Sequence, residues 1–325
     1  MFKRLIVSAA RKLHDLSFAF PAMVGAFRRL QRVGINVTPN HFYWPVPDLT
    51  ELEKREWPTY SAPPGCNFDL RKQVELAWEL SSDYGKECRF PSEPQESSFH
   101  YNNGYFEAVD AEVAYCMVRR FKPSRVVEIG TGYSTRVLAA ALKENAERDH
   151  IAGKLVSVDP YPERFPRNGW SNLVVQIPSA VQDVKLDFFN TLESGDILFI
   201  DSSHVVGVGS DVVREYLEIL PRLKPGVIVH VHDIFLPSDY PRDAVLNRLW
   251  FWSEQYLLQA FLTFNSKFEV LWASSALHIH YPSVLEHCFP RWKNSYLDMP
   301  ESKRQFVPTL DGNHVWPSSF WMRRV

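Results

Sequence analysis

The feature that most constrains this chain is a regular alternation of short apolar runs with amphipathic segments, which begins near Asn102. The runs consist mainly of consecutive Val, Ile, Leu and Phe residues. Such runs are typical of strands buried on both faces of a parallel sheet, and the amphipathic segments supply the helices that cover it. We therefore predict an α/β fold with a Rossmann-like, doubly wound sheet, whose strands lie at 125–130, 154–159, 173–177, 196–201, 227–233 and 268–273.

The segments between these runs predict the helices. Asp110 stands where it can cap a helix whose apolar face contains Val113 and Met117. Lys224-Pro225-Gly226 is a stop and turn signal before the fifth run. We expect further helices over about 70–82, 134–147, 181–192, 212–220 and 243–264.

The first hundred residues differ in composition, and we predict that they form an extension, irregular with some helix, to a domain spanning residues 101–325. Residues 1–34 carry seven Lys and Arg against one acid, which fits a basic amphipathic helix on a membrane, on a partner, or packed on its own domain. Residues 35–100 are rich in Pro, which suppresses regular structure. Their aromatic run, residues 41–44, is apolar enough to pack as a lid over a site.

Composition excludes several classes of function. The net charge of −2 does not indicate a polyanionic partner, and no aromatic and basic nucleic-acid motif occurs. The four cysteines are widely spaced, which argues against a zinc cluster or a disulfide framework. No apolar run approaches the length of a membrane span, and charged residues interrupt the N-terminal segment where a secretory signal would be apolar. We expect a cytoplasmic protein, with peripheral membrane contact through residues 1–34 and homo-oligomerisation left open.

The informative polar residues follow the predicted strands at their carboxyl ends. Since ligands of such folds bind at that edge of the sheet, these groups are expected to converge on one site. They are Glu128, Gly130 and Gly132 after the first run, Asp159 after the second, Asp201 and His204 after the fourth, and His232 and Asp233 after the fifth.

The turn EIGTGYST, residues 128–135, is compatible with two nucleotide cofactors. Its glycines permit close backbone approach to a ligand. A dinucleotide fingerprint would need Gly or Ala where Thr135 stands and an acid about twenty residues on, whereas Asp159 follows Gly132 by 27 residues. Glu128 would repel a pyrophosphate but suits a ligand with a cationic or amino group.

The pattern E-x-G-x-G followed by Ser-Thr, with an acid ending the next strand, resembles class I S-adenosylmethionine-dependent methyltransferases. Residues 106–235 resemble the methyltransferase-24 type family. The resemblance implies a seven-stranded sheet whose last strand, SFWMRRV, is antiparallel and enters beside the fifth. It also implies that Asp159 binds the ribose hydroxyls. The cofactor site that we predict comprises Glu128, Gly130, Thr131, Gly132, Ser134, Asp159, Ala180, Val181 and Asp201.

The residues after the fourth and fifth runs supply candidate catalytic groups. Asp201, His232 and Asp233 can hold a divalent cation such as Mg²⁺, as some relatives do, although His232 and Ser203 stand where those relatives carry acids. The alternative use is acid–base chemistry. His204 is then the first candidate base and His232 the second, with Asp201 and Asp233 orienting the base or holding a cation. His278 and His280, which would share one face of a strand, are expected to be structural.

These patterns together favour S-adenosylmethionine-dependent methyl transfer, most simply to a hydroxyl of a small molecule or glycan. Two alternatives stay open from the sequence. One is an NAD(P)-dependent oxidoreductase, and the other is a catalytically silent module of the same fold that binds the cofactor without turnover.

Overall fold

The computed structural model describes residues 21–38, 40, 44–57, 59–60, 62–94, 98–161 and 173–325. Within the described part the chain forms two compact units, which divide between Glu56 and Trp57. Residues 57–100, which we expected in the extension, fall in the second unit. The first twenty residues of the predicted basic helix, and residues 41–43 of the predicted lid, lie outside the described residues.

Among its described residues, the first unit contains two short helices, α2 (Pro21–Gln31) and α3 (Leu49–Leu52). α3 begins after Asp48, whose carboxylate accepts hydrogen bonds from the backbone N–H groups of Thr50 and Glu51. Such a side-chain cap satisfies backbone donors that the first helical turn leaves unpaired.

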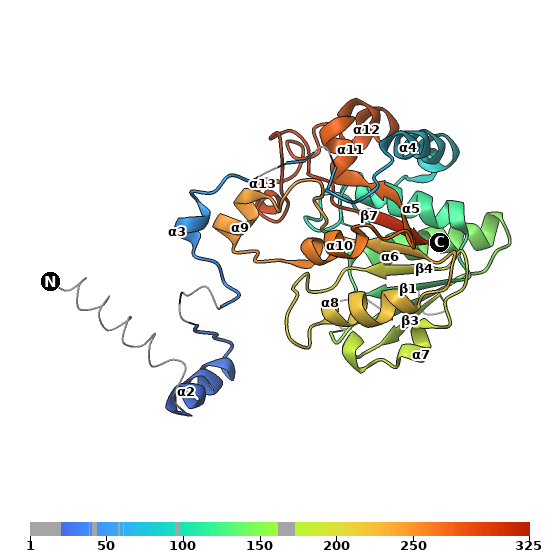
Figure 1. The fold of residues 1–325 in the computed structure, drawn as a ribbon. Helices are drawn as coiled ribbons and strands as arrows, with labels where there is room; N and C mark the ends of the chain where they lie inside the picture. Colours follow the sequence, from blue (N-terminus) through green and yellow to red (C-terminus); the bar gives the residue numbers. More distant parts are fainter. Residues whose placement is uncertain are drawn as a thin grey trace. The chain divides into compact units, whose positions relative to one another are not determined.

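The second unit is built on one seven-stranded sheet in the order β3-β2-β1-β4-β5-β7-β6 (Figure 1). β7 runs antiparallel to both of its neighbours, β5 and β6, and the pairs among the other strands are parallel. This confirms the predicted Rossmann-like sheet with an antiparallel last strand. The strands are β1 (Arg125–Ile129), β2 (Lys154–Val158), β3 (Val174–Ile177), β4 (Ile197–Ile200), β5 (Ile228–Val231), β6 (Phe268–Ala273) and β7 (Phe320–Arg324).

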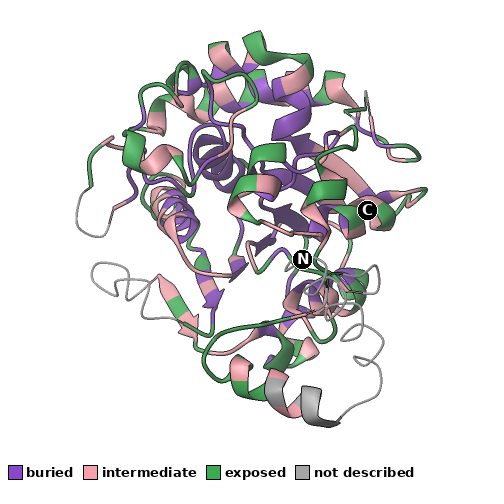
Figure 2. Ribbon diagram, turned by 90° about the vertical axis from the view of Figure 1, so that its left-hand side faces the viewer, coloured by how far each residue is buried: buried purple, intermediate pink, exposed green. Residues whose placement is uncertain are grey.

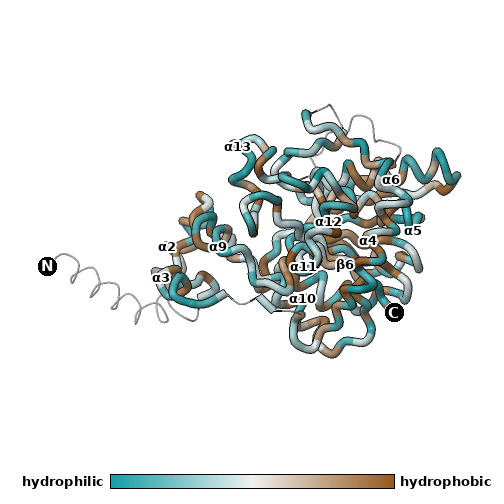
Figure 3. Tube along the Cα trace, turned by 90° about the horizontal axis from the view of Figure 1, so that it is seen from above, coloured by the Kyte–Doolittle hydropathy of each residue, from teal (hydrophilic) through white to brown (hydrophobic). Residues whose placement is uncertain are grey.

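Helices pack on both faces of the sheet because successive strand residues point to opposite sides. Val126 joins a hydrophobic cluster with residues of α4, α5 and α6, whereas Val127 joins a second cluster with residues of α7, α8 and α10. Figure 2 shows the central strands coloured as buried, and in Figure 3 hydrophobic residues gather around β6 and α4. The helices named here are α4 (Leu70–Tyr84), α5 (Asp110–Phe121), α6 (Tyr133–Arg148), α7 (Leu186–Phe189), α8 (Asp211–Arg214) and α10 (Glu254–Leu262).

Three predicted helices differ in the structure. The region 181–192 contains only η3 (Val181–Asp183) and α7, and the helix from α8 continues through η4 (Glu215–Ile219) and η5 (Leu220–Arg222). The long helix expected over 243–264 divides into α9 (Arg242–Arg248) and α10. The break follows Leu249, whose φ of +61° takes the backbone out of the right-handed helix.

The remaining elements complete the second unit. The two histidines that we expected on a strand lie instead in α11 (Ser274–His280). Ser81 of α4 donates a hydrogen bond to the carbonyl oxygen of Cys288 at the end of α12, which ties residues before position 100 to the sheet domain. The other bounds are η1 (Gly85–Glu87), α12 (Pro282–Cys288), η6 (Pro290–Trp292) and α13 (Glu301–Arg304).

Candidate active site

The turn after β1 brings two strand ends into unusually close contact. Gly130 has a φ of +92°, and a Cβ atom built there would lie 2.0 Å from the carbonyl oxygen of Asp201. Asp201 follows β4 and donates its backbone N–H to the carbonyl of Ile129. Only glycine allows both this conformation and this approach. The glycine turn is therefore joined, through backbone, to Asp201, the first of the predicted catalytic residues in the chain.

Glu128 is buried behind the glycine turn rather than exposed on its surface. Its two carboxylate oxygens accept hydrogen bonds from the hydroxyls of Ser134 (2.8 Å) and Thr135 (2.7 Å) in the first turn of α6. Burial raises the pKa of Glu128 to about 8, although these two hydrogen bonds oppose the shift. Glu128 thus fixes the start of α6. Thr135, which stands where a dinucleotide fingerprint would have its third glycine, is one of the two hydroxyl partners of Glu128.

The raised pKa of Glu128 predicts a measurable effect on stability. Between pH 4.5 and about 8 the unfolded chain has lost this proton and the folded chain keeps it, so the free energy of unfolding falls as pH rises. Glu128→Gln should remove this contribution, flattening the dependence by up to about 1.4 kcal/mol per pH unit. Urea denaturation at several pH values measures how the free energy of unfolding depends on pH, and Glu75→Gln, at an exposed position, is the control. An unchanged slope in Glu128→Gln would contradict the assignment.

The ends of β2 and β3 lie beside the glycine turn. Asp159 is buried at the end of β2, and its Oδ1 accepts the backbone N–H of Tyr161 at 2.6 Å. Its own N–H donates to the carbonyl of Ile177 in β3. Ala180 and Val181 follow β3, where η3 begins. The parallel register of β1, β2 and β3 places all these residues at the same edge of the sheet, as predicted.

At the same edge, two histidines and two aspartates form a compact group that we call the rim cluster: Asp201, His204, His232 and Asp233. His204 Nε2 lies 3.5 Å from Asp201 Oδ1 and 3.3 Å from Asp233 Oδ2. His232 Nδ1 lies 3.5 Å and 3.6 Å from the same two oxygens. The structure therefore brings together every residue predicted for catalysis or metal binding.

Two residues outside the predicted set hold the rim cluster in place. Glu254, buried in α10, contacts His204 Nδ1 at 2.8 Å, which directs Nε2 of that ring toward the two aspartates. Asp110 approaches His232 Nε2 at 3.7 Å. Asp110 begins α5 but does not cap it as we expected. Its oxygens accept hydrogen bonds from the backbone N–H groups of Ser318 and Ser319, because the side chain turns toward the entrance of β7.

The charges of the rim cluster are strongly coupled. Burial alone would lower the pKa of His204, but the carboxylates of Asp201, Glu254 and Asp233 outweigh it and raise that pKa well above the ordinary range. His232 shows the same balance, with its pKa raised by Asp233 and Asp201 against burial. Burial would raise the pKa of Asp201, yet the two histidines hold it below its ordinary value. The cluster therefore needs positive charge, from protons or from a cation.

Two cavities open at this edge and share two residues, Tyr105 and Asp201. The first, of about 560 Å³, is lined by Thr131, Gly132 and Ser134 of the glycine turn, and we call it the cofactor cavity because these residues are predicted to bind the cofactor. The second, of about 550 Å³, is lined by the whole rim cluster, and we call it the acceptor cavity because these residues are predicted for catalysis or metal binding. Asp201, also predicted for the cofactor, lines the first cavity too. The other residues predicted for the cofactor do not line it: Glu128, Gly130, Asp159, Ala180 and Val181. The predicted catalytic residues line the adjacent cavity.

Aromatic rings form the walls of the acceptor cavity. Trp250 stacks on Trp252 with ring centroids 4.4 Å apart, and Trp252 lies against His204 at 4.7 Å. On another wall Tyr105 stacks on Phe306 at 5.6 Å. Trp316 also lines this cavity, and among the described residues no Lys or Arg does. These surfaces suit a flat or ring-shaped acceptor without negative charge.

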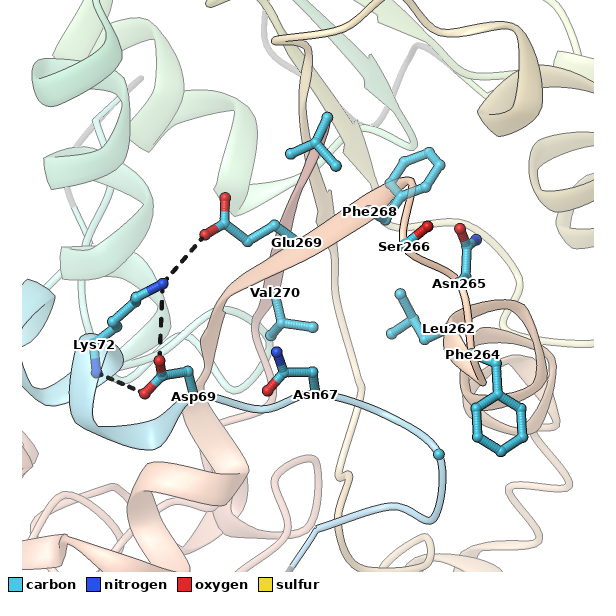
Figure 4. Close-up of a pocket in the computed structure, with 12 residues that line it drawn as sticks. Asn67, Asp69, Lys72, Leu262, Phe264, Asn265, Ser266, Phe268, Glu269 and Val270 are labelled. Carbon is cyan, nitrogen blue, oxygen red and sulfur yellow. Dashed lines mark hydrogen bonds and ion pairs between the residues drawn. The ribbon is translucent and has the colours of Figure 1, made fainter.

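A third cavity, of about 440 Å³, lies at the opposite edge of the sheet, near the start of β6 (Figure 4). Its polar wall is an ion-pair set in which Lys72 lies between Asp69 and Glu269. It lies away from the carboxyl ends of the parallel strands, where such folds bind their ligands.

Comparison with known proteins identifies the chain. The family model described as a methyltransferase domain matches residues 127–234, which run from β1 to the end of the rim cluster. The chain belongs to the class I S-adenosylmethionine-dependent methyltransferases. This methyltransferase is also 31% identical to an uncharacterised protein of Archaeoglobus fulgidus, over 51% of this chain and 78% of that protein.

Solved structures with a similar arrangement include other methyltransferases. One, from Podospora anserina and bound to S-adenosylhomocysteine, is 14% identical, with a TM-score of 0.40 over 81% of this chain and 90% of its own. An O-methyltransferase of Bacillus cereus in complex with S-adenosylhomocysteine is 14% identical, with a TM-score of 0.35 over 78% and 90%.

Family membership decides between the cofactors that the sequence left open: this methyltransferase uses S-adenosylmethionine, and the oxidoreductase alternative falls away. As regards membranes, none of the helices in the described ranges combines the length and the apolar character that crossing a bilayer requires.

Proposed function

We propose that this methyltransferase transfers the methyl group of S-adenosylmethionine to a hydroxyl of a small molecule or glycan held in the acceptor cavity. The observation that carries the proposal is the junction of the two cavities at Asp201 and Tyr105. A cofactor on the glycine turn would present its methyl group near this junction, and an acceptor between the aromatic walls would meet it there. Methyl transfer is an in-line substitution, so positioning supplies much of the catalysis.

We further propose that the rim cluster binds a divalent cation. The ligand atoms of Asp201, His204 and Asp233 all lie within 4.8 Å of one another, and His232 Nδ1 faces the same two carboxylates. Imidazole and carboxylate together suit a first-row transition ion such as Mn²⁺ better than Mg²⁺, which prefers oxygen ligands. A cation bound here would lower the pKa of an acceptor hydroxyl that contacts it, so that the hydroxyl would release its proton to solvent before the methyl group is transferred.

The chain's own groups prepare the cluster for this role. Glu254 accepts a hydrogen bond from His204 Nδ1, which leaves Nε2 as the nitrogen that faces Asp201 and Asp233. Trp252 packs against the His204 ring and limits the access of water. Without a cation, the two aspartates hold His204 and His232 in their protonated forms, in which neither imidazole can accept a proton from a hydroxyl.

Binding of the cofactor is tested by titrating the protein with S-adenosylhomocysteine and with NAD in a calorimeter. We expect micromolar affinity for S-adenosylhomocysteine, and Asp159→Ala should weaken it at least about tenfold, because hydrogen bonds to a charged group are worth about 1.5–3 kcal/mol each. Asp187→Ala in α7, an acid away from the site edge, is the matched control. Binding of NAD alone, or an unaffected Asp159→Ala variant, would overturn the assignment.

Transfer is tested with S-adenosylmethionine labelled in its methyl group and a panel of catechols, phenols and glycosides, in the presence of Mn²⁺. Label is expected to appear in an uncharged hydroxyl compound. Cofactor binding without transfer to any hydroxyl acceptor would favour the silent-module alternative, and transfer to an amine in its place would contradict O-methylation.

A further inference from the structure

The cofactor cavity has one positive and one negative side chain among the described residues that line it. These are Arg136, the fourth residue of α6, and Asp201 after β4. The other walls are uncharged: aromatic rings, hydroxyls and the glycine turn. Opposite single charges on the wall of a cavity are suited to a ligand that carries one ammonium and one carboxylate group.

Two uncharged groups hold the guanidinium of Arg136 in place. Nη1 donates to the carbonyl oxygen of Ser98 at 2.9 Å, and the guanidinium lies over the ring of Tyr133 at 5.3 Å. A carbonyl and an aromatic face orient a guanidinium but do not neutralise it. Across the described part of the chain, no carboxylate forms an ion pair with Arg136, and its remaining N–H donors have no protein acceptor.

We propose that Arg136 binds the carboxylate of the methionine part of S-adenosylmethionine. This inference rests on the proposed place of the cofactor on the glycine turn, whose residues Thr131, Gly132 and Ser134 line the same cavity as Arg136. The planar guanidinium matches a carboxylate with two parallel hydrogen bonds, which lysine cannot supply. Asp201, on the wall of the same cavity, is then the group that faces the ammonium of the methionine part.

The test compares two ligands, S-adenosylhomocysteine and its analogue that lacks only the carboxylate, by calorimetric titration of the full chain. Arg136→Gln should weaken the binding of S-adenosylhomocysteine roughly 10- to 100-fold, which is the range expected when a charge-assisted hydrogen-bonded pair is lost. The affinity of Arg136→Gln for the decarboxylated analogue should match that of the wild type within about twofold, because this analogue lacks the carboxylate that Arg136 would bind. Arg136→Lys should recover part of the loss.

Lys143→Gln is the matched control, because it removes one positive charge from an exposed position of the same helix, where Lys143 pairs with Glu147. It should bind both ligands as the wild type does. If Arg136→Gln weakened the binding of both ligands equally, Arg136 would only support the fold of the turn. That result would overturn the role proposed for Arg136 but not the proposed cofactor site. Failure of the wild type to bind S-adenosylhomocysteine would overturn both the inference and the proposed cofactor site.

Discussion

Asp233→Asn is expected to weaken Mn²⁺ binding by at least about 100-fold and to reduce methyl transfer by a similar factor, because a metal ligand contributes several kcal/mol to such a site. Asp233 Oδ2 faces both histidines of the rim cluster, and Oδ1 accepts a hydrogen bond from Ser318. Its φ of +57° is a conformation that Asn also tolerates. The substitution therefore removes a charge while keeping shape and backbone.

The measurement combines titration of the protein with Mn²⁺ and with Mg²⁺, and assay of transfer before and after EDTA. We expect tighter binding of Mn²⁺ than of Mg²⁺, loss of transfer in EDTA, and its recovery when Mn²⁺ is added in excess. Because Asp233 lines only the acceptor cavity, binding of S-adenosylhomocysteine should stay within about twofold of wild type.

Asp239→Asn is the control for this experiment, since it makes the same chemical change six residues on, where Asp239 accepts hydrogen bonds from Tyr240 and Tyr256 instead of facing the cluster. Transfer that persists unchanged in EDTA, or a wild type that does not bind Mn²⁺, would refute the proposed cation site.

Gly130→Ala should lower the free energy of unfolding by at least about 3 kcal/mol and should abolish measurable binding of S-adenosylhomocysteine. Two costs combine. A φ of +92° is unfavourable for any residue with a side chain, and the new Cβ would lie 2.0 Å from the carbonyl oxygen of Asp201. Since that oxygen belongs to backbone, relief requires β1 and β4 to separate where the two cavities meet.

Gly209→Ala separates the two costs, because Gly209 also has a positive φ, of +73°, but open space where its Cβ would be. The free energy of unfolding of Gly209→Ala should fall by only about 1 kcal/mol, which is the cost of the backbone conformation alone. Urea denaturation followed by circular dichroism gives both values. Equal losses in the two variants would show that the contact between Gly130 and Asp201 carries no energy of its own.

Sequence reasoning located the sheet and the site edge because both are local consequences of pattern. Buried strands show as apolar runs, and the polar residues that follow them share one edge in a parallel sheet. It placed Asp110 wrongly, as a helix cap, because the partners of that carboxylate, just before β7, are more than two hundred residues away in the chain. His278 and His280 alternate as residues on one face of a strand do, yet they lie in α11, because periodicity alone does not separate a short buried helix from a strand.

The residues that sequence reasoning missed have no local signal. Glu254 is one acid in the first turn of a helix, where acids are common, and only the fold brings it to His204 fifty residues earlier in the chain. Arg136 likewise reads as an ordinary helix residue until the cavity beside it is seen. Long-range contacts of this kind follow from packing, which a single sequence does not display.

The insertion of β7 between β5 and β6 has a consequence for synthesis of the protein on the ribosome. The segment entering β7 supplies Ser318, which bonds Asp233, and both backbone N–H groups that hold Asp110. Strands β1 to β5 can therefore emerge and pair while the acceptor cavity is still incomplete. The glycine turn is therefore synthesised early, whereas the acceptor cavity is complete only when Val315, Trp316 and Ser318 have been added to the chain.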